Sequence, residues 1–260
     1  MLRVTAVACL KDNYAYLLED GSGELAVVDA SEEGPVLAAM AGTEGRLTAI
    51  FSTHHHYDHV GGNNELVSEY RDVRVFGYET DKGRIPGQTE FLRDGQTFRW
   101  GKTTFKVLHI PGHTLGAVAY VAEDAVFTGD TLFLAGCGRL FEGSPAMMFR
   151  SLNDVLASLD ESTRVFCGHE YTISNLAFSA TVEPSNTQVA ERLARARELR
   201  KHNEATVGSQ LREELATNPF LRCHSSEIRD AMKLGAHAPD VEVFAALRRA
   251  KDTFRAPTPT

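Results

Sequence analysis

The segment Thr53–His59 carries more ionisable side chains than a folded chain can bury without a ligand. It reads Thr-His-His-His-Tyr-Asp-His and lies between the apolar run Leu47–Ser52 and a glycine pair. Each imidazole or carboxylate that was buried unpaired would cost several kcal/mol of lost hydration. A divalent cation satisfies them together, because imidazole nitrogen and carboxylate oxygen are ligands for Zn²⁺ and Fe²⁺. The segment therefore predicts a metal centre at the end of a strand.

The spacing within this segment divides the ligands into two sets. In the pattern H-x-H-x-D-H, His54 and His56 point the same way at a strand end. Asp58 and His59 can face a neighbouring site as the loop turns into a helix. His55 is flanked by these residues, and we expect its side chain to point away from them. The alternative is a solvent-exposed histidine cluster that binds no metal.

Further candidate ligands follow three other predicted strands, each beside a glycine that lets the chain turn sharply. They are His113 after Phe105–Ile110, Asp130 after Ala125–Thr128, and His169 after Arg164–Cys167. With the first segment they supply five histidines and two aspartates at one sheet edge. This is enough for two metal ions with three ligands each and one shared carboxylate. Asp29, at another strand end, is either an orienting partner of a ligand imidazole or an ordinary turn residue.

Composition limits the classes of partner. The 260 residues have a formal net charge of −8, which argues against a nonspecific nucleic-acid or membrane-surface binder. No run of eighteen apolar residues occurs, and the first residues lack the features of a signal peptide, so we expect a cytoplasmic protein. The four cysteines are widely spaced, which fits reduced thiols.

The pattern along the chain changes near residue 170. Short β-branched runs separated by Gly, Asp and Asn give way to helical periodicity, which predicts an α/β domain over residues 1–171 and a helical domain over residues 172–260. A helix is expected from Ser144-Pro145, with the proline in its first turn. Ser185 and Gln188 predict a capping box. Asp240 is expected to cap the last helix.

In their order along the chain, the candidate ligands resemble the metallo-β-lactamase superfamily, and the resemblance is closer to one of its branches, glyoxalase II (the hydroxyacylglutathione hydrolases). The stretches that carry it are Thr53–Gly62, Pro111–Thr114, Thr128–Phe133, Ala135–Arg139, Cys167–Thr172, Asn218–Arg222 and Arg248–Asp252. The resemblance covers essentially the whole chain. It implies an αββα sandwich of the α/β class with a dinuclear metal site, followed by a C-terminal α-helical domain that binds substrate.

The resemblance also implies roles for individual residues. One metal ion is held by His54, His56 and His113, the other by Asp58, His59 and His169, and Asp130 bridges the two. Asp58 also orients the metal-bound hydroxide. The residues implied to bind glutathione are Arg139, Tyr171, Arg248 and Lys251.

Two features bear on the implied glutathione site. Arg248 and Lys251 are three residues apart on a predicted helix and share a face, so they could hold a carboxylate of the tripeptide. A solvated basic helix end is the alternative. Phe141 stands where many relatives have a tyrosine, so a phenolic hydrogen bond to glutathione is missing.

The activity implied is hydrolysis of S-D-lactoylglutathione to D-lactate and glutathione, the second step of methylglyoxal detoxification. The alternatives are a persulfide dioxygenase, which uses one iron and dispenses with the second set of ligands, and another superfamily hydrolase such as an RNase Z-type nuclease, which would need a basic surface. We expect a monomer with two divalent ions, zinc first and iron or manganese as alternatives. No nucleic-acid or membrane partner is expected.

Overall fold

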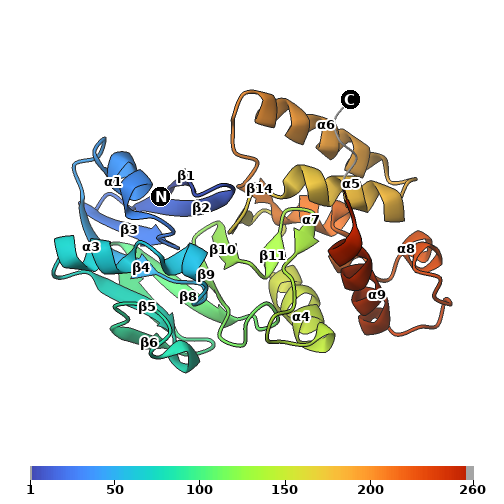
Figure 1. Cartoon of the computed structure of the whole chain (residues 1–260), viewed down its shortest axis with the longest axis horizontal. Coiled ribbons are helices and arrows are strands. Elements are labelled where there is room, and N and C mark those ends of the chain that lie inside the picture. The colour runs from blue at the N-terminus through green and yellow to red at the C-terminus, as the bar shows by residue number, and fades with distance from the viewer. Residues whose placement is uncertain (1, 256–260) are drawn as a thin grey trace.

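Two six-stranded sheets form the centre of the protein, whose structure is a computed structural model that describes residues 2–255 (Figure 1). Residue 1 and residues 256–260 of the predicted domain ranges lie outside the described residues. The first sheet has the order β1-β2-β3-β4-β5-β6, and its strands are β1 (Arg3–Cys9), β2 (Asn13–Glu19), β3 (Glu24–Val28), β4 (Arg46–Phe51), β5 (Arg74–Tyr78) and β6 (Glu90–Leu92).

The second sheet has the order β14-β13-β10-β9-β8-β7. Its strands are β7 (Thr97–Trp100), β8 (Thr103–His109), β9 (Val118–Ala122), β10 (Ala125–Gly129), β13 (Arg164–Cys167) and β14 (Ser209–Gln210). A separate two-stranded ribbon joins β11 (Leu132–Phe133) to β12 (Gly136–Cys137). Strands β3 to β6 are parallel, which explains why β4 is apolar on both faces.

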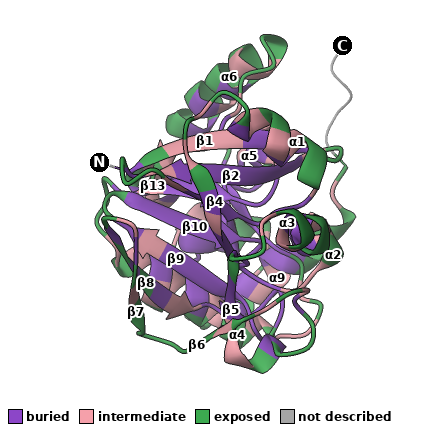
Figure 2. Cartoon of the chain, turned by 90° about the vertical axis from the view of Figure 1, so that its left-hand side faces the viewer, coloured by how far each residue is buried: buried purple, intermediate pink, exposed green. Residues whose placement is uncertain are grey.

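Aromatic side chains fill the space between the two sheets. Phe51 on β4 is fully buried, and its ring lies 4.9 Å from that of Phe105 and 5.5 Å from that of Tyr120, both on the opposite sheet. Phe76 packs on it from the neighbouring strand at 5.1 Å. Side chains from the two sheets therefore form one core, and Figure 2 shows the strands largely buried.

Helices cover the outer faces of both sheets. The outer face of the first sheet packs against α1 (Glu33–Met40) and α3 (Asn63–Glu69), and the short α2 (Tyr57–Val60) follows β4. The outer face of the second sheet packs against α4 (Pro145–Arg150), which continues as a π-helical turn Ser151–Val155 and a 3₁₀ turn Leu156–Ser158. The layers run helix, sheet, sheet, helix, as the resemblance implies.

The C-terminal helices extend the core of the second sheet. They are α5 (Thr172–Val182), α6 (Thr187–Lys201), α7 (Leu211–Thr217), α8 (Ser226–Ala231) and α9 (Asp240–Thr253), with a 3₁₀ turn at Pro219–Leu221. Another 3₁₀ turn, Glu79–Asp81, follows β5 in the first sheet. Phe220 and Phe244 belong to the same buried cluster as Val126 and Val165 of the sheet. The predicted helical character of this region is confirmed. The boundary after residue 171 stays a prediction.

The predicted helix starts have mixed outcomes. The helix α4 begins at Pro145 with the proline in its first turn, as expected, and Ser144 caps it by accepting a bond from the Met147 amide. The capping box at Ser185 is wrong: α6 begins after Asn186, and the Ser185 hydroxyl donates to Glu227 at 2.6 Å. Asp240 is the first residue of α9 rather than its cap, and its carboxylate pairs with Arg229. In both cases the side chain predicted to cap a helix instead binds a charged side chain that is distant in the sequence: Ser185 binds Glu227 and Asp240 binds Arg229.

No helix within residues 2–255 combines the length and the apolar character needed to cross a membrane. The four cysteines are all buried free thiols, as expected.

Replacing Phe51 with alanine tests the core between the sheets. Phe51→Ala should lower the free energy of unfolding by about 3–5 kcal/mol, because a fully buried ring leaves a cavity. Phe91→Ala is the matched control, since Phe91 is 42% exposed and should cost about 1 kcal/mol or less. Denaturant unfolding of both variants provides the measurement. Equal losses for the two variants would contradict this account of the core.

Candidate metal centre and substrate cleft

All seven predicted metal ligands lie together at one edge of the two sheets. His54 and His56 follow β4, Asp58 and His59 lie on α2, and the other three follow β8, β10 and β13: His113, Asp130 and His169. Three groups have ligand atoms within 4.8 Å of one another: His54 with His56 and His113, Asp58 with His59 and His169, and a third in which Asp29 joins His54 and His59. The first two are the sets that the resemblance implies.

Asp130 lies between the two groups. Its Oδ1 is 3.2 Å from Nε2 of His59, and its Oδ2 is 3.3 Å from Nε2 of His169. The same Oδ2 is 3.5 Å from Nε2 of His113 in the other group. A carboxylate in this place can contribute to both groups.

Buried atoms without hydrogen-bond partners test whether the cluster suits a cation. In the part of the chain that the structure describes, His54 Nε2, His59 Nε2 and Asp130 Oδ1 are buried and make no hydrogen bond of acceptable geometry, although the last two lie 3.2 Å apart. Unsatisfied buried polar atoms are rare, and three within one cluster call for a ligand that accepts their lone pairs. A divalent cation with nitrogen and oxygen ligands fits this requirement.

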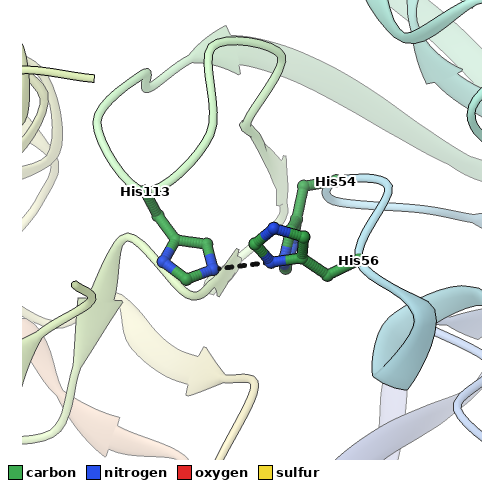
Figure 3. A group of neighbouring side chains, drawn as sticks. All are labelled: His54, His56 and His113. Atoms are coloured by element: carbon green, nitrogen blue, oxygen red, sulfur yellow. Dashed lines mark hydrogen bonds between the residues drawn. The ribbon is translucent and has the colours of Figure 1, made fainter. Parts of the chain in front are cut away.

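The group His54, His56 and His113 consists of neutral imidazoles. Figure 3 shows the three rings converging, with His113 Nε2 2.9 Å from His56 Nδ1. Burial, followed by neighbouring histidines, lowers the pKa of His56 to about 4 and holds the pKa of His54 well below its usual value. Burial also lowers the pKa of His113. Neutral imidazole is the form that binds a metal ion.

In the other group, the carboxylates of Asp58 and Asp130 interact with the imidazoles of His59 and His169, and each changes the pKa of its partners. Burial opposes protonation of His59 and His169, but the carboxylate of Asp130 raises both pKa values, that of His169 to about 10. Asp58 has its pKa lowered, first by the hydrogen bond from His169, and Asp130 has its pKa lowered by the two histidines against the effect of burial. Without a cation, protons on the imidazoles balance the carboxylates. A bound cation would replace them.

Carboxylates and an amide outside the two groups hold the ligands in place. Asp29 Oδ2 accepts from His59 Nδ1 at 2.9 Å, and its two oxygens also accept from Thr53, so the orienting alternative for Asp29 describes its position. Asp12 Oδ1 accepts from His169 Nδ1 at 2.9 Å. Asn13 Nδ2 donates to Asp58 Oδ2 at 3.0 Å. Such contacts fix the direction of a ligand side chain.

Sequence reasoning missed Asp12 and Asn13. Asp12 lies in the turn between β1 and β2, and Asn13 is the first residue of β2. Asp and Asn are common at such turns for purely local reasons, so their identity gave no usable signal. His55 points away from the groups as expected, and contacts Asp81 at 3.3 Å and Arg84.

A cleft of about 730 Å³ opens beside the cluster. All four residues implied to bind glutathione line it: Arg139, Tyr171, Arg248 and Lys251. Lys251 on α9 donates to Ser174 at 3.3 Å, and burial, followed by Arg248, lowers its pKa to about 8. Arg248 also lines the cleft, but its Nη1 donates to the Cys137 carbonyl at 2.7 Å and its Nη2 lies 3.0 Å from Asp252.

Two aromatic rings link the cleft to the cluster. Tyr171 stacks on His169 with ring centroids 4.7 Å apart. Phe141 is 65% exposed in the cleft, and its ring lies 5.4 Å from that of His56 and 5.2 Å from that of His113. The cleft therefore has ligand groups and an apolar ring at one end and basic side chains from the helical region along its wall.

Comparison with known proteins identifies the family. The family model "Metallo-beta-lactamase superfamily" matches residues 11–169, and the model "Hydroxyacylglutathione hydrolase C-terminus" matches residues 170–254. The hydroxyacylglutathione hydrolase of Methylococcus capsulatus is 51% identical over 258 residues, which are 98% of this chain and 100% of that protein. The chain belongs to the hydroxyacylglutathione hydrolases, a branch of the metallo-β-lactamase superfamily.

A second relative carries the same family name, and a solved structure is similar in sequence and fold. The hydroxyacylglutathione hydrolase of Thermosynechococcus vestitus is 50% identical over 94% of this chain and 97% of its own length. The crystal structure of TTHA1623 in a di-iron-bound form is 29% identical, has a TM-score of 0.59, and covers 84% of this chain and 100% of its own. Membership of the superfamily implies two divalent metal ions, and the histidine and aspartate groups fit them.

Proposed function

We propose that this hydroxyacylglutathione hydrolase converts S-D-lactoylglutathione and water to D-lactate and glutathione, the second step of methylglyoxal detoxification. One observation carries the proposal: a single cleft brings a cluster of metal-ligating side chains together with basic residues of the helical region. That region as a whole matches the family model "Hydroxyacylglutathione hydrolase C-terminus". A glutathione thioester carries net negative charge. A chain of net charge −8 must gather cationic side chains locally to bind it.

The proposed metal ligands are the seven clustered residues. One ion would be held by His54, His56 and His113, the other by Asp58, His59 and His169, and Asp130 would bridge them. Zinc is the first choice, with iron or manganese as alternatives, because nitrogen and carboxylate ligands accept all three. Divalent cations at these positions would lower the pKa of water toward neutrality and polarise the thioester carbonyl.

The chain's own residues orient the reactants. Asp58 stays ionised because its pKa is held low, so its carboxylate can accept a hydrogen bond from the attacking water and direct it to the carbonyl carbon. Asn13 fixes that carboxylate through its 3.0 Å bond. The sulfur leaves as a thiolate, which needs little protonation, so no separate general acid is required. Arg139, Tyr171, Arg248 and Lys251 would hold the glutathione half.

Hydrolysis of the thioester by the purified protein tests the function. We expect S-D-lactoylglutathione to disappear with release of one glutathione and one D-lactate per thioester. Oxygen consumption with glutathione persulfide and no thioester cleavage would instead support the persulfide dioxygenase alternative. Failure of both reactions with fully metal-loaded protein would reject the proposal.

Removing the proposed bridge should lower metal content and hydrolysis together. In Asp130→Ala, two cations would face each other with less negative charge between them. Metal analysis of the purified variant, beside its turnover, is the measurement. Two retained ions with near-normal turnover would show that Asp130 is not the bridge.

Replacing Lys251 should affect binding more than turnover. Lys251→Ala should raise KM for the glutathione thioester by roughly ten-fold or more, since a charge-assisted hydrogen bond contributes about 1.5–3 kcal/mol. The value of kcat should change much less, because the contact is remote from the reacting carbonyl. Lys201→Ala, on the exposed α6 and paired with Glu198, is the control and should leave both constants unchanged. A large fall in kcat with unchanged KM would contradict the assignment.

The lowered pKa of Lys251 gives the binding a pH dependence. The amine is charged below about pH 8 and loses its charge above it, so kcat/KM for the glutathione thioester should fall as pH rises through that region. Lys251→Arg keeps the charge and should remove this decline. The pH profiles of wild type and variant are compared directly. Identical profiles would show that Lys251 does not titrate in substrate binding.

We also propose that the enzyme acts as a monomer in the cytoplasm, without nucleic-acid or membrane partners. The acidic net charge supports the absence of polyanionic partners. Light scattering of the purified protein tests the oligomeric state, and cell fractionation tests the location.

A further inference from the structure

We propose that the helical region does more than bind glutathione: it positions the metal-ligating residues His113 and Asp130 through the ribbon and loop of residues 133–139. Asn218 and Glu214 are the positioning residues. The inference rests on the proposed function only in taking His113 and Asp130 as metal ligands.

The ribbon cannot hold its own shape. It begins two residues after Asp130 and pairs only Leu132 with Cys137 and Phe133 with Gly136. A two-stranded ribbon of this size is not stable alone in water. Its turn also places Ala135 at φ 54°, a left-handed conformation that costs a non-glycine residue about 1–3 kcal/mol unless its surroundings hold it.

Side chains of the helical region hold every residue of the ribbon from Phe133 to Cys137. In each case the bond is to a backbone atom. The bonds run from Asn218 Nδ2 to the carbonyls of Phe133 (3.3 Å) and Gly136 (3.0 Å), from Asn175 Nδ2 to that of Leu134 (3.1 Å), from Arg248 Nη1 to that of Cys137 (2.7 Å), and from the Ala135 amide to Glu214 Oε2 (2.7 Å). These contacts fix the path of the chain independently of the side chains that the ribbon carries.

The far end of this loop contacts the metal groups. The Arg139 carbonyl accepts from His113 Nδ1 at 2.8 Å, which directs His113 Nε2 toward the cluster. Gly138 donates its amide to the Thr131 carbonyl at 3.3 Å, and a Cβ at Gly138 would collide with the Asp130 carbonyl. A change in the loop path would therefore turn His113 and displace the backbone beside Asp130.

The two positioning residues are buried and mutually bonded. Asn218 and Glu214 have no exposed surface, and Asn218 Nδ2 also donates to Glu214 Oε2 at 3.1 Å. The other oxygen of Glu214 pairs with Arg192 on α6, itself 4% exposed. The ion pair compensates the buried charge of Glu214 and anchors the contact to a helix outside the cleft.

Two variants test the inference. Asn218→Ala removes the donor to two ribbon carbonyls. Glu214→Gln is milder, because glutamine keeps the size and shape of the side chain. Its single amide oxygen cannot accept from both the Ala135 amide and Arg192, so one of these two contacts is lost. Each should weaken Zn²⁺ affinity by up to about ten-fold, the lower end of what loss of a direct outer contact to a metal ligand costs, because these residues act on His113 and Asp130 through the loop. Each should also lower kcat with saturating S-D-lactoylglutathione. Zn²⁺ affinity is measured by competition with a chromophoric chelator.

Matched controls separate this effect from general loss of stability. Glu183→Gln neutralises another buried glutamate, 5% exposed, whose bonds go to Arg222, Asn186 and Ser225 within the helical region. Asn186→Ala removes donors to Glu183 and the Ala216 carbonyl, again away from the ribbon. Both controls should keep wild-type Zn²⁺ affinity and kcat.

The outcomes decide between two roles of the helical region. Wild-type Zn²⁺ affinity and kcat in Asn218→Ala or Glu214→Gln, with only a higher KM, would overturn the inference and leave that region a glutathione-binding role alone. If Asn218→Ala does not fold, Glu214→Gln decides. If the wild type cleaves no glutathione thioester, the proposed function fails, whereas the Zn²⁺ affinities still test the positioning role.

Discussion

The carboxylate of Asp130, buried among imidazoles, is the interaction on which the rest of the site depends. It lies within 3.5 Å of His59 on α2 and of His113 and His169, which follow β8 and β13, and burial makes each of those contacts strong. Separate loops are thereby forced to meet at one point. Burying this charge is unfavourable unless the loops hold the imidazoles close to it. This explains the hydrogen bonds that Asp29, Asp12 and Asn13 make to the side chains of the cluster.

The two sheets make this convergence possible. His54 and His56 are delivered by the first sheet, and His113, Asp130 and His169 by the second, so the relative position of the sheets sets the distance between ligands. The aromatic core around Phe51 fixes that position with large, rigid side chains. Side-chain packing between the two sheets therefore also determines the distances between the ligands at their edge.

The sequence predicts the ligands far better than it predicts what supports them. His54, His56, Asp58 and His59 stand within six positions, and each remaining ligand follows a strand that its β-branched residues indicate, so local pattern is enough. Asn13 lies 45 positions from Asp58, and Glu214 lies 79 from Ala135. Nothing local distinguishes a buried glutamate in an amphipathic helix from an exposed one. The Ser185 cap fails for the same reason, because its partner Glu227 is 42 positions away.

The continuous core between the second sheet and the C-terminal helices has a consequence for how the molecule opens. Val126 and Val165 of the sheet share one buried cluster with Phe220, Phe244 and Leu247 of the helices, so the helices cannot detach without wetting the sheet. Native-state hydrogen exchange would then report the amides of β10, β13 and α9 as one cooperative unit, whatever boundary the sequence pattern draws between them.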